Sequence, residues 1–389
     1  MKILYGCANC AEKKYEQWST ATVQPAQKYH RLLMHGLVQN GVEVYCYSGL
    51  PINRSITKKL FIHEKDEIEK GVRYHYYKTI NLPIFRQIMI MWGARFALRK
   101  HSKKEPTVIF CDFLNRANSI GLLKGNKRKK FPVIMIVTDL PEYLFDEATA
   151  EKYNQLLSKA DGYIFLTEQM NTRVNKENKP YIVLEGHVDS LLPETLVNEK
   201  YENSTGKKVV VYAGSIKRLY GIQNLVEGFI KANIPDAELQ IFGEGDYREE
   251  LTRIAEKHPN VKYMGIRSNN EIVEIEKRAA LLVNPRPIAP EYTQYSFPSK
   301  NMEYMVSGTP VLTTRLPGMP KEYYQYVYTI EDDSIDGIKQ ALINCFSNSA
   351  EERNAKGIQA REFVLTNKSN VIQSKKIINF VQKEVLKLC

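Results

Sequence analysis

The chain has 389 residues, of which 43% are hydrophobic and 25% are charged. This length exceeds that of one ordinary domain, so we expect two, and the composition excludes a disordered or fibrous protein. No run of about 18 apolar residues is present, and the apolar start MKILYGCANC is too short for a secretory signal. We therefore expect a cytoplasmic protein.

The net charge of +11 is distributed unevenly between the two halves. Residues 1–190 contain 29 lysines and arginines and 19 acidic residues, whereas residues 191–389 contain 26 and 25. Within the first half, residues 95–130 alone hold 11 basic and 2 acidic side chains. This excess predicts an anionic partner for the N-terminal half.

The six cysteines are dispersed, which favours reduced thiols over a disulfide framework. Cys7 and Cys10 form the only C-x-x-C pair, and no second pair or nearby histidine completes a zinc site. The sequence also contains no Asp-x-Asp motif that would hold a divalent metal. We therefore expect a protein without a metal ion.

Short β-rich runs alternate with amphipathic helical stretches in both halves. In the first half we predict helices over 25–41 and 147–160 and strands at 2–6, 42–47, 107–112, 132–139, 162–167 and 180–185. A polar stretch at 188–206 is the predicted linker. In the second half we predict a helical tail from 349 and strands at 208–214, 237–243, 261–265, 280–285 and 309–314. This alternation predicts the α/β class, with two Rossmann-like, doubly wound domains facing a cleft.

The segment 295–311, YSFPSKNMEYMVSGTPV, holds the most specific pattern. We expect a helix whose first residue is Pro298 and which ends at a glycine before a buried strand. Such a helix start offers free N–H groups to an anion, and Ser299 and Lys300 add a hydroxyl and a positive charge. Glu303, one turn further, can accept hydrogen bonds from ribose hydroxyls. The spacing alone also fits a capped surface helix with a solvated carboxylate.

This segment resembles the nucleotide-sugar signature of the family-four retaining glycosyltransferases, which have the GT-B fold. Their pattern is E-x7-E followed by an apolar pair, a small residue, glycine, a small residue and Pro-Val. Glu303, Gly308, Pro310 and Val311 match this pattern, whereas Tyr295 stands where the first glutamate normally lies. The form SFPSK-x-x-EYM resembles a branch of the family that acts in polysaccharide biosynthesis.

The resemblance implies a Rossmann-like acceptor domain at 1–190, a Rossmann-like donor domain at 191–370, and a C-terminal helix at 371–389 that packs back toward the first domain. It also implies a metal-independent hexosyltransferase that needs no cofactor beyond its co-substrate, a UDP- or GDP-sugar. The acceptor would be a glycan or a lipid-diphosphate-linked molecule in capsule or exopolysaccharide assembly.

The resemblance extends over most of 208–315. In VVYAGSIKRLYGIQNLVEGF (210–229), the family normally has an arginine and a lysine that hold the donor diphosphate, but Ser215 and Tyr220 occupy their places. We expect the two bases of the same loop to replace them. The whole expected donor-binding set is Gly214, Ser215, Lys217, Arg218, Gly243, Gly245, Ile266, Arg267, Tyr295, Pro298, Ser299, Lys300 and Glu303.

Three residues are expected to act in catalysis: Asp139, Lys300 and Glu303. Asp139 ends the predicted strand 132–139, where a doubly wound sheet presents functional groups. Lys300 and the helix start would neutralise the charge of the departing diphosphate. The family often has a histidine near Asp139, and the sequence has none there. His187, before the linker, fits a cleft residue or a hinge equally well.

Two other functions fit parts of the sequence. An NDP-sugar epimerase can have the same fold, but we would expect catalytic carboxylates and a histidine in its cleft, and the sequence does not reveal such a set. A nucleic-acid-binding or non-catalytic nucleotide-sugar-binding protein is the other alternative. The basic residues 95–130 lack a regular interleaving with aromatic residues, so we expect no nucleic acid partner.

The stretch LPIFRQIMIMWGARFAL (82–98) suggests a further partner. It mixes Trp92 and other large apolar residues with Arg86 and Arg95, and the basic cluster 127–130 follows it. An interfacial helix would bury Trp92 among lipid headgroups while the bases meet anionic lipid, which would place the protein peripherally at the inner face of a membrane. A core helix with its polar side in water fits the same pattern.

Overall fold

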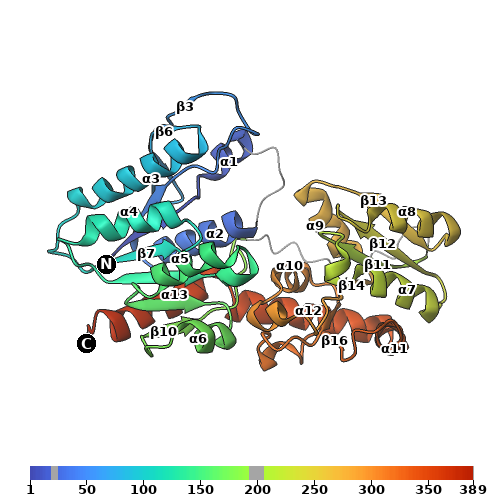
Figure 1. Cartoon of the computed structure of the whole chain (residues 1–389). Coiled ribbons are helices and arrows are strands. Elements are labelled where there is room, and N and C mark those ends of the chain that lie inside the picture. Colours follow the sequence, from blue (N-terminus) through green and yellow to red (C-terminus); the bar gives the residue numbers. More distant parts are fainter. Residues whose placement is uncertain (19–24, 192–205, 389) are drawn as a thin grey trace. The chain divides into compact units, whose positions relative to one another are not determined.

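A computed structural model describes residues 1–18, 25–191 and 206–388 (Figure 1). The chain divides into two compact units. Unit 1 comprises Met1–His187 together with Ser369–Cys389, and unit 2 comprises Val188–Lys368. Most of the predicted linker, 188–206, lies outside the described residues.

Unit 1 is built on an eight-stranded sheet. In sheet order its strands are β10 (Tyr181–Val183), β9 (Gly162–Phe165), β8 (Val133–Val137), β7 (Thr107–Asp112), β1 (Lys2–Cys7), β2 (Glu43–Ser48), β5 (Val72–Tyr76) and β4 (Glu67–Glu69). Neighbouring strands are parallel, except that β4 pairs with β5 in the antiparallel sense. A separate antiparallel pair joins β3 (Phe61–Ile62) to β6 (Thr79–Ile80).

The helices of unit 1 connect these strands. They are α1 (Glu12–Trp18), α2 (Pro25–Gln39), α3 (Pro83–Ala97), α4 (Arg116–Asn126), α5 (Glu147–Leu157), α6 (Glu168–Val174) and α13 (Asn370–Phe380), with short helical turns at Leu98–Lys100, Pro141–Tyr143 and Val381–Val385. The strands β7 and β8 are buried along their whole length, as expected for nearly continuous apolar runs covered on both faces.

The order of the strands places a switch point between β7 and β1. From β1 the chain continues to β2 on one side, and it later returns to β7 on the other side. In open parallel sheets, ligands bind outside the carboxyl ends of the strands at such a point. The carboxyl ends of β1 and β7 are therefore the first place to look for functional residues in unit 1.

The C-terminal segment of the chain returns to unit 1 through α13, which packs on α2. The Nδ2 of Asn370 donates to the carbonyl of Leu32 at 3.2 Å, and the Oγ of Ser374 donates to the carbonyl of Leu33 at 3.2 Å. A Cβ added at Gly36 would lie 2.2 Å from the carbonyl oxygen of Asn370. The two helices thus approach so closely that α2 needs a glycine at this position.

Unit 2 is built on a six-stranded parallel sheet. In sheet order its strands are β13 (Val261–Gly265), β12 (Ala237–Phe242), β11 (Lys208–Ala213), β14 (Leu281–Asn284), β15 (Val311–Thr314) and β16 (Tyr328–Ile330). Its helices are α7 (Ile222–Ala232), α8 (Arg248–Lys257), α9 (Asn269–Arg278), α10 (Ser299–Ser307), α11 (Ile335–Ser347) and α12 (Ala350–Asn367). Short 3-10 helices lie at Arg218–Tyr220, Glu291–Tyr295 and Lys321–Tyr323.

The predicted α/β class with parallel sheets in both halves is confirmed. Individual bounds differ slightly, since the helix predicted over 147–160 ends at Leu157 and the helix predicted over 25–41 ends at Gln39. Among the described helices, none combines the length and the apolar character needed to cross a membrane. The five cysteines of the described chain are buried free thiols, and burial raises the pKa of both Cys10 and Cys111 to about 12.

Candidate functional site

Two glycine turns meet at the carboxyl edge of the unit 2 sheet. The amide of Gly214, after β11, donates to the carbonyl of Phe242 at 2.9 Å, and the amide of Ile216 donates to the carbonyl of Glu244 at 2.8 Å. A Cβ added at Gly243 would lie 1.8 Å from the carbonyl oxygen of Gly214. The turns after β11 and β12 are therefore packed backbone against backbone, and a side chain at Gly243 would force them apart.

Close backbone packing also explains the glycine at position 245, two residues after Gly243. A Cβ at Gly245 would lie 2.2 Å from the carbonyl oxygen of Ile216. Gly243 has a φ of +130°, which L side chains rarely adopt. The G-x-G pattern of residues 243–245 is thus explained by close packing of the backbone, whether or not a ligand binds there.

The helix α10 begins beside these turns. Its N-cap is Pro298, whose side chain makes no capping hydrogen bond. The sequence analysis placed Pro298 inside the helix, whereas the structure places it one residue before the helix start at Ser299. The helix ends at Gly308, whose φ of +80° permits the left-handed C-cap. The first turn of the helix and the positive end of its dipole therefore lie at the carboxyl edge of the sheet.

Buried side chains fix α10 against the strands. The amide of Ala213 donates to the hydroxyl oxygen of Tyr304 at 3.1 Å, and the Nδ2 of Asn284 donates to the Oδ1 of Asn301 at 2.8 Å. Burial raises the pKa of Tyr304 well above its usual value, so its hydroxyl stays neutral. The start of α10 consequently has a fixed position relative to the ends of β11 and β14.

Lys300 reaches from the first turn of α10 to the end of β11. Its ammonium donates to the carbonyl of Ala213, and it lies 6.0 Å from the centre of the Tyr212 ring. A Cβ added at Gly214 would lie 2.5 Å from the Lys300 Nζ. The structure therefore brings together three predicted features: Lys300, Gly214 and the start of α10. Together they form a half-buried positive site at which an anion would meet an ammonium and helix N–H groups.

The remaining predicted residues of this segment surround the helix start. Ser299 is exposed, Glu303 is half-buried one turn further along α10, and Tyr295 is half-buried at the end of a 3-10 helix. All three therefore lie in the same short segment as Lys300.

The charge of Arg218 is paired with a neighbouring carboxylate. Its guanidinium pairs with the carboxylate of Glu250 and donates to the Oε1 of Gln223 at 2.7 Å, and it lies 4.8 Å from the centre of the Tyr247 ring. The pair with Glu250 raises the pKa of Arg218. In the described structure Arg218 thus contacts residues of α7 and α8 and does not contact Lys300. The neighbouring Lys217 is exposed.

Arg286 is a basic residue that the sequence analysis missed. It follows β14, and its guanidinium lies 4.8 Å from the centre of the Tyr220 ring and 5.8 Å from that of Tyr292. Its Nη1 donates to the Oγ of Ser296 at 3.5 Å. Burial raises the pKa of Tyr292, and the charge of Arg286 opposes this effect. The signal was present in the sequence as a base two residues after a buried strand.

Ile266 and Arg267 follow β13 at the edge of the sheet. Ile266 is 57% exposed, and Arg267 donates to the carbonyl of Ile266 at 3.0 Å. Ser268 then begins α9 with a capping box completed by Glu271. Ile266 and Arg267 are accessible to a ligand. No contact between the described residues connects either of them with Lys300.

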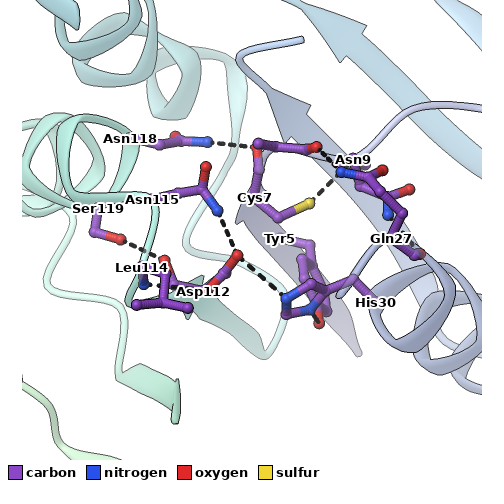
Figure 2. A network of polar contacts seen from close by, with 12 residues as sticks. Tyr5, Cys7, Asn9, Gln27, His30, Asp112, Leu114, Asn115, Asn118 and Ser119 are labelled. Carbon is purple, nitrogen blue, oxygen red and sulfur yellow. Dashed lines mark hydrogen bonds and ion pairs between the residues drawn. The ribbon is translucent and has the colours of Figure 1, made fainter. Parts of the chain in front are cut away.

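In unit 1, Asp139 is exposed two residues after β8. A different carboxylate, Asp112 at the end of β7, lies at the switch point and belongs to a buried network that the sequence analysis did not find (Figure 2). The Oδ2 of Asp112 lies 3.2 Å from the Nε2 of His30 on α2, and the Nδ1 of His30 lies 2.7 Å from the hydroxyl of Tyr5 on β1. Asn115 also donates to Asp112.

Polar side chains continue this network around the end of β1. Asn118 donates to the carbonyl of Cys7 at 3.0 Å (Figure 2). It also donates to the carbonyl of Tyr47 at 2.8 Å, and Asn9 donates to the carbonyl of Gln27 at 2.8 Å. The two bonds of Asn118 satisfy carbonyls at the ends of β1 and β2, and the bond of Asn9 joins the loop after β1 to α2, so the network holds the loops at the switch point in place. His187 lies nearby, since it shares a hydrogen bond with the carbonyl of Tyr29 at 2.8 Å.

Comparison with known proteins gives the class of the molecule. Residues 194–363 match the family model of glycosyl transferases group 1. The structure of HepE from Anabaena in complex with UDP is similar, with a TM-score of 0.68 and 14% identity over 98% of this chain and 99% of HepE. Sucrose-phosphate synthase from Thermosynechococcus elongatus is similar with a TM-score of 0.69 and 14% identity, over 97% of this chain and 98% of the synthase. The lipopolysaccharide outer core galactosyltransferase WaaB is similar with a TM-score of 0.59 and 14% identity, over 98% of this chain and 99% of WaaB. No curated protein sequence matches significantly.

Two units with parallel α/β sheets, and this similarity over nearly the full length, define the GT-B class of fold. Residues 194–363 are similar to the group 1 glycosyl transferases, so the enzyme class is that of a glycosyltransferase. The predicted fold and enzyme class are therefore confirmed. The individual donor-binding and catalytic residues stay predictions.

We expect Arg286→Gln to weaken the binding of UDP or GDP, whichever binds the native enzyme better, by about tenfold or more. A hydrogen bond to a charged group contributes about 1.5 to 3 kcal/mol, and tenfold corresponds to about 1.4 kcal/mol. Isothermal titration calorimetry would measure the change. Arg253→Gln, on the exposed face of α8, is the control, and Arg218→Gln tests the base that was predicted from the sequence. Equal affinities of the Arg286 and Arg253 variants would contradict a role for Arg286.

Proposed function

We propose that the enzyme is a retaining glycosyltransferase that moves a sugar from a UDP- or GDP-sugar to a glycan or lipid-linked acceptor in surface polysaccharide assembly. The docking of Lys300 and the start of α10 against Gly214 is the observation that carries this proposal. Two similar proteins support it. HepE has been solved with UDP and with UDP-glucose, and WaaB acts on the outer core of lipopolysaccharide.

In the proposed donor site, the diphosphate lies against the start of α10. The N–H groups of the helix and the ammonium of Lys300 bind its oxygens, and the glycine turns let the backbone approach it closely. Glu303 accepts hydrogen bonds from the ribose hydroxyls. The other members of the proposed donor set are Arg286 and the residues expected from the sequence: Ser215, Lys217, Arg218, Gly243, Gly245, Ile266, Arg267, Tyr295, Pro298 and Ser299.

Breaking the glycosidic bond increases the negative charge on the departing diphosphate. A preorganised ammonium and helix dipole stabilise that charge without reorganisation, so Lys300 lowers the barrier more than it strengthens ground-state binding. Within the described ranges, no group of three or more His, Cys, Asp or Glu side chains is arranged to hold a metal ion. We propose that Asp139 acts on the acceptor side and that the reaction proceeds without a metal ion.

We expect Glu303→Ala to weaken donor binding and to reduce transfer by at least about tenfold while the protein stays folded. Loss of a charged hydrogen-bond acceptor costs about 1.5 to 3 kcal/mol. Thermal shift with a panel of UDP- and GDP-sugars identifies the donor, and its Kd and kcat are then compared between the variant and the native enzyme. Glu291→Ala removes an exposed carboxylate from a neighbouring 3-10 helix and serves as the control. Unchanged affinity and turnover in folded Glu303→Ala protein would refute the assignment.

We expect Lys300→Ala to lower kcat more than it raises the Kd of the donor, because charge on the leaving group grows in the transition state. Single-turnover transfer and calorimetry measure the two effects separately. Because Lys300 also binds the carbonyl of Ala213, the melting temperature of the variant must be compared with that of the native protein.

Addition of EDTA to the native enzyme completes this test. We expect transfer to continue at its normal rate, since Lys300 and α10 supply the positive charge. Loss of activity with EDTA and its return with Mg²⁺ or Mn²⁺ would show that the metal-free mechanism is wrong.

We also propose that unit 1 contacts an anionic membrane through α3 and the basic residues beside it. Five large apolar side chains of α3 are between 41% and 74% exposed: Ile84, Phe85, Ile88, Trp92 and Phe96. The opposite side of the helix is buried and packs on α4, where a Cβ at Gly121 would lie 2.4 Å from the carbonyl oxygen of Met91. An apolar face of this size on one helix supports a contact with a partner or a lipid surface.

Basic residues gather at one end of this face. Gly121 lies against Met91 and Gly125 lies against Arg95, so α3 and α4 run side by side in the same direction (Figure 1). Their C-terminal ends therefore adjoin, and the bases that follow them are Arg99, Lys100, Lys127, Arg128, Lys129 and Lys130. Each base near an anionic surface contributes about 1 kcal/mol.

We expect the native enzyme to sediment with liposomes that contain anionic lipid at low salt, and to be released at high salt, because salt screens these charges. A variant in which Lys127, Arg128, Lys129 and Lys130 are changed to glutamine should bind less. The matched control changes four exposed bases of unit 2 to glutamine: Lys231, Arg253, Lys257 and Lys262. Equal and negligible binding to anionic and neutral liposomes at low salt would contradict membrane contact.

A further inference from the structure

Two adjoining cavities lie in unit 1 over the N-terminal half of α3. The first has a volume of about 380 Å³ and is bounded by α3, the start of α4 and α5. The second has a volume of about 730 Å³ and is bounded by α3 and residues 53–55. Arg86, Gln87 and Ile88 line both cavities, so the two adjoin at this helix.

The first cavity lies at the switch point of the unit 1 sheet. Asn115 and Asn118, which line it, are the residues that bind Asp112 at the end of β7 and the carbonyl of Cys7 at the end of β1 (Figure 2). Gly49, just after β2, lines it as well. The cavity therefore opens outside the carboxyl ends of three parallel strands, where doubly wound sheets bind their ligands.

Positive charge dominates the lining. Arg86 and Arg116 belong to the first cavity, Arg54 and Arg86 belong to the second, and none of the described residues that line either cavity is acidic. Asp112 is the nearby carboxylate, and it is already bound by His30 and Asn115. The first turn of α4 also faces the first cavity, and within the described chain no side chain caps it.

The two arginines of the first cavity lack an anionic partner in the described part of unit 1. Arg86 is half-buried and donates to the carbonyl of Leu50 at 3.0 Å, and burial alone lowers its pKa. The Nε of Arg116 is buried without any hydrogen-bond partner among the described residues. Guanidinium groups that are partly removed from water are stabilised by anionic partners, so this arrangement favours an anion that supplies several oxygen atoms.

The second cavity has a different character. Pro83, Ile84 and Ile88 contribute apolar surface to it, and Ile84 is 74% exposed. This surface begins at Arg86 and continues along the exposed face of α3. A ligand whose charged group lies between the arginines can therefore place an apolar chain in the neighbouring cavity.

We propose that the two cavities form one acceptor site, which binds the diphosphate of a prenyl-diphosphate-linked acceptor at Arg86 and Arg116 and the first part of its prenyl chain along Pro83, Ile84 and Ile88. This proposal rests on the proposed function, because it names the acceptor class of that same enzyme. A diphosphate suits the site because its oxygens can pair with both guanidinium groups and with N–H groups of α4 at the same time.

The binding of geranyl diphosphate, a short soluble probe, tests this site by calorimetry. Saturating UDP or GDP is present throughout, so that the probe cannot occupy the donor site. We expect geranyl diphosphate to bind, inorganic pyrophosphate to bind more weakly, and uncharged geraniol not to bind. We expect the double variant Arg86→Gln with Arg116→Gln to bind geranyl diphosphate at least about tenfold more weakly.

A matched double variant, Lys103→Gln with Lys104→Gln, removes two exposed bases of unit 1 away from the cavities and should bind the probe normally. If the arginine double variant unfolds, Arg116→Gln alone decides, because the Nε of Arg116 has no partner in the described structure whose loss would destabilise the fold.

Three results would overturn the proposal. They are an absence of probe binding to native enzyme that binds UDP or GDP normally, equal binding by the arginine variant and the lysine variant, and equal affinity for pyrophosphate and geranyl diphosphate. The first two would refute the diphosphate site, and the third would refute the role of the apolar cavity. A native enzyme that binds neither UDP nor GDP would instead refute the proposed donor site, so the two failures are distinguishable.

Discussion

The close contact between the turn after β11 and the turn after β12 determines the geometry of unit 2. With only hydrogen atoms at Gly214, Gly243 and Gly245, two backbone segments fit into a space that side chains fill elsewhere. This leaves room at the end of β11 for the ammonium of Lys300, and the carbonyl of Ala213 fixes that ammonium in place. A positive charge is thus held at the sheet edge by backbone atoms, which do not change rotamer when a ligand arrives.

Unit 1 follows a different principle. Its switch point is held by side chains: Asp112, His30 and Tyr5 form one chain of polar contacts, and Asn118 joins the ends of adjacent strands. Amide and imidazole groups offer both donors and acceptors, so this network satisfies buried polar groups in several directions at once. The two halves therefore share an architecture but fix the carboxyl edges of their sheets by different means.

The sequence could predict the fold class and the helix of residues 299–307, because alternating strands and helices and a glycine stop are local patterns. It could not reveal the pair of His30 and Asp112, since these residues are far apart in the chain and meet only in the folded unit. Arg286 was missed for a related reason: its contacts with Tyr220 and Ser296 come from two separate loops. The roles of Asp139, Lys300 and Glu303 remain predictions, because side-chain positions alone do not define a ligand.

The packing of α13 on α2 has a consequence for how the protein is made. All of unit 2, residues 188–368, lies in the chain between the first part of unit 1 and its last helix. During synthesis unit 2 can therefore be complete while α2 still exposes the surface around Gly36 that the backbone of Asn370 covers in the finished molecule. The N-terminal unit begins first and is finished last, so this surface of α2 stays uncovered until the last helix has been made.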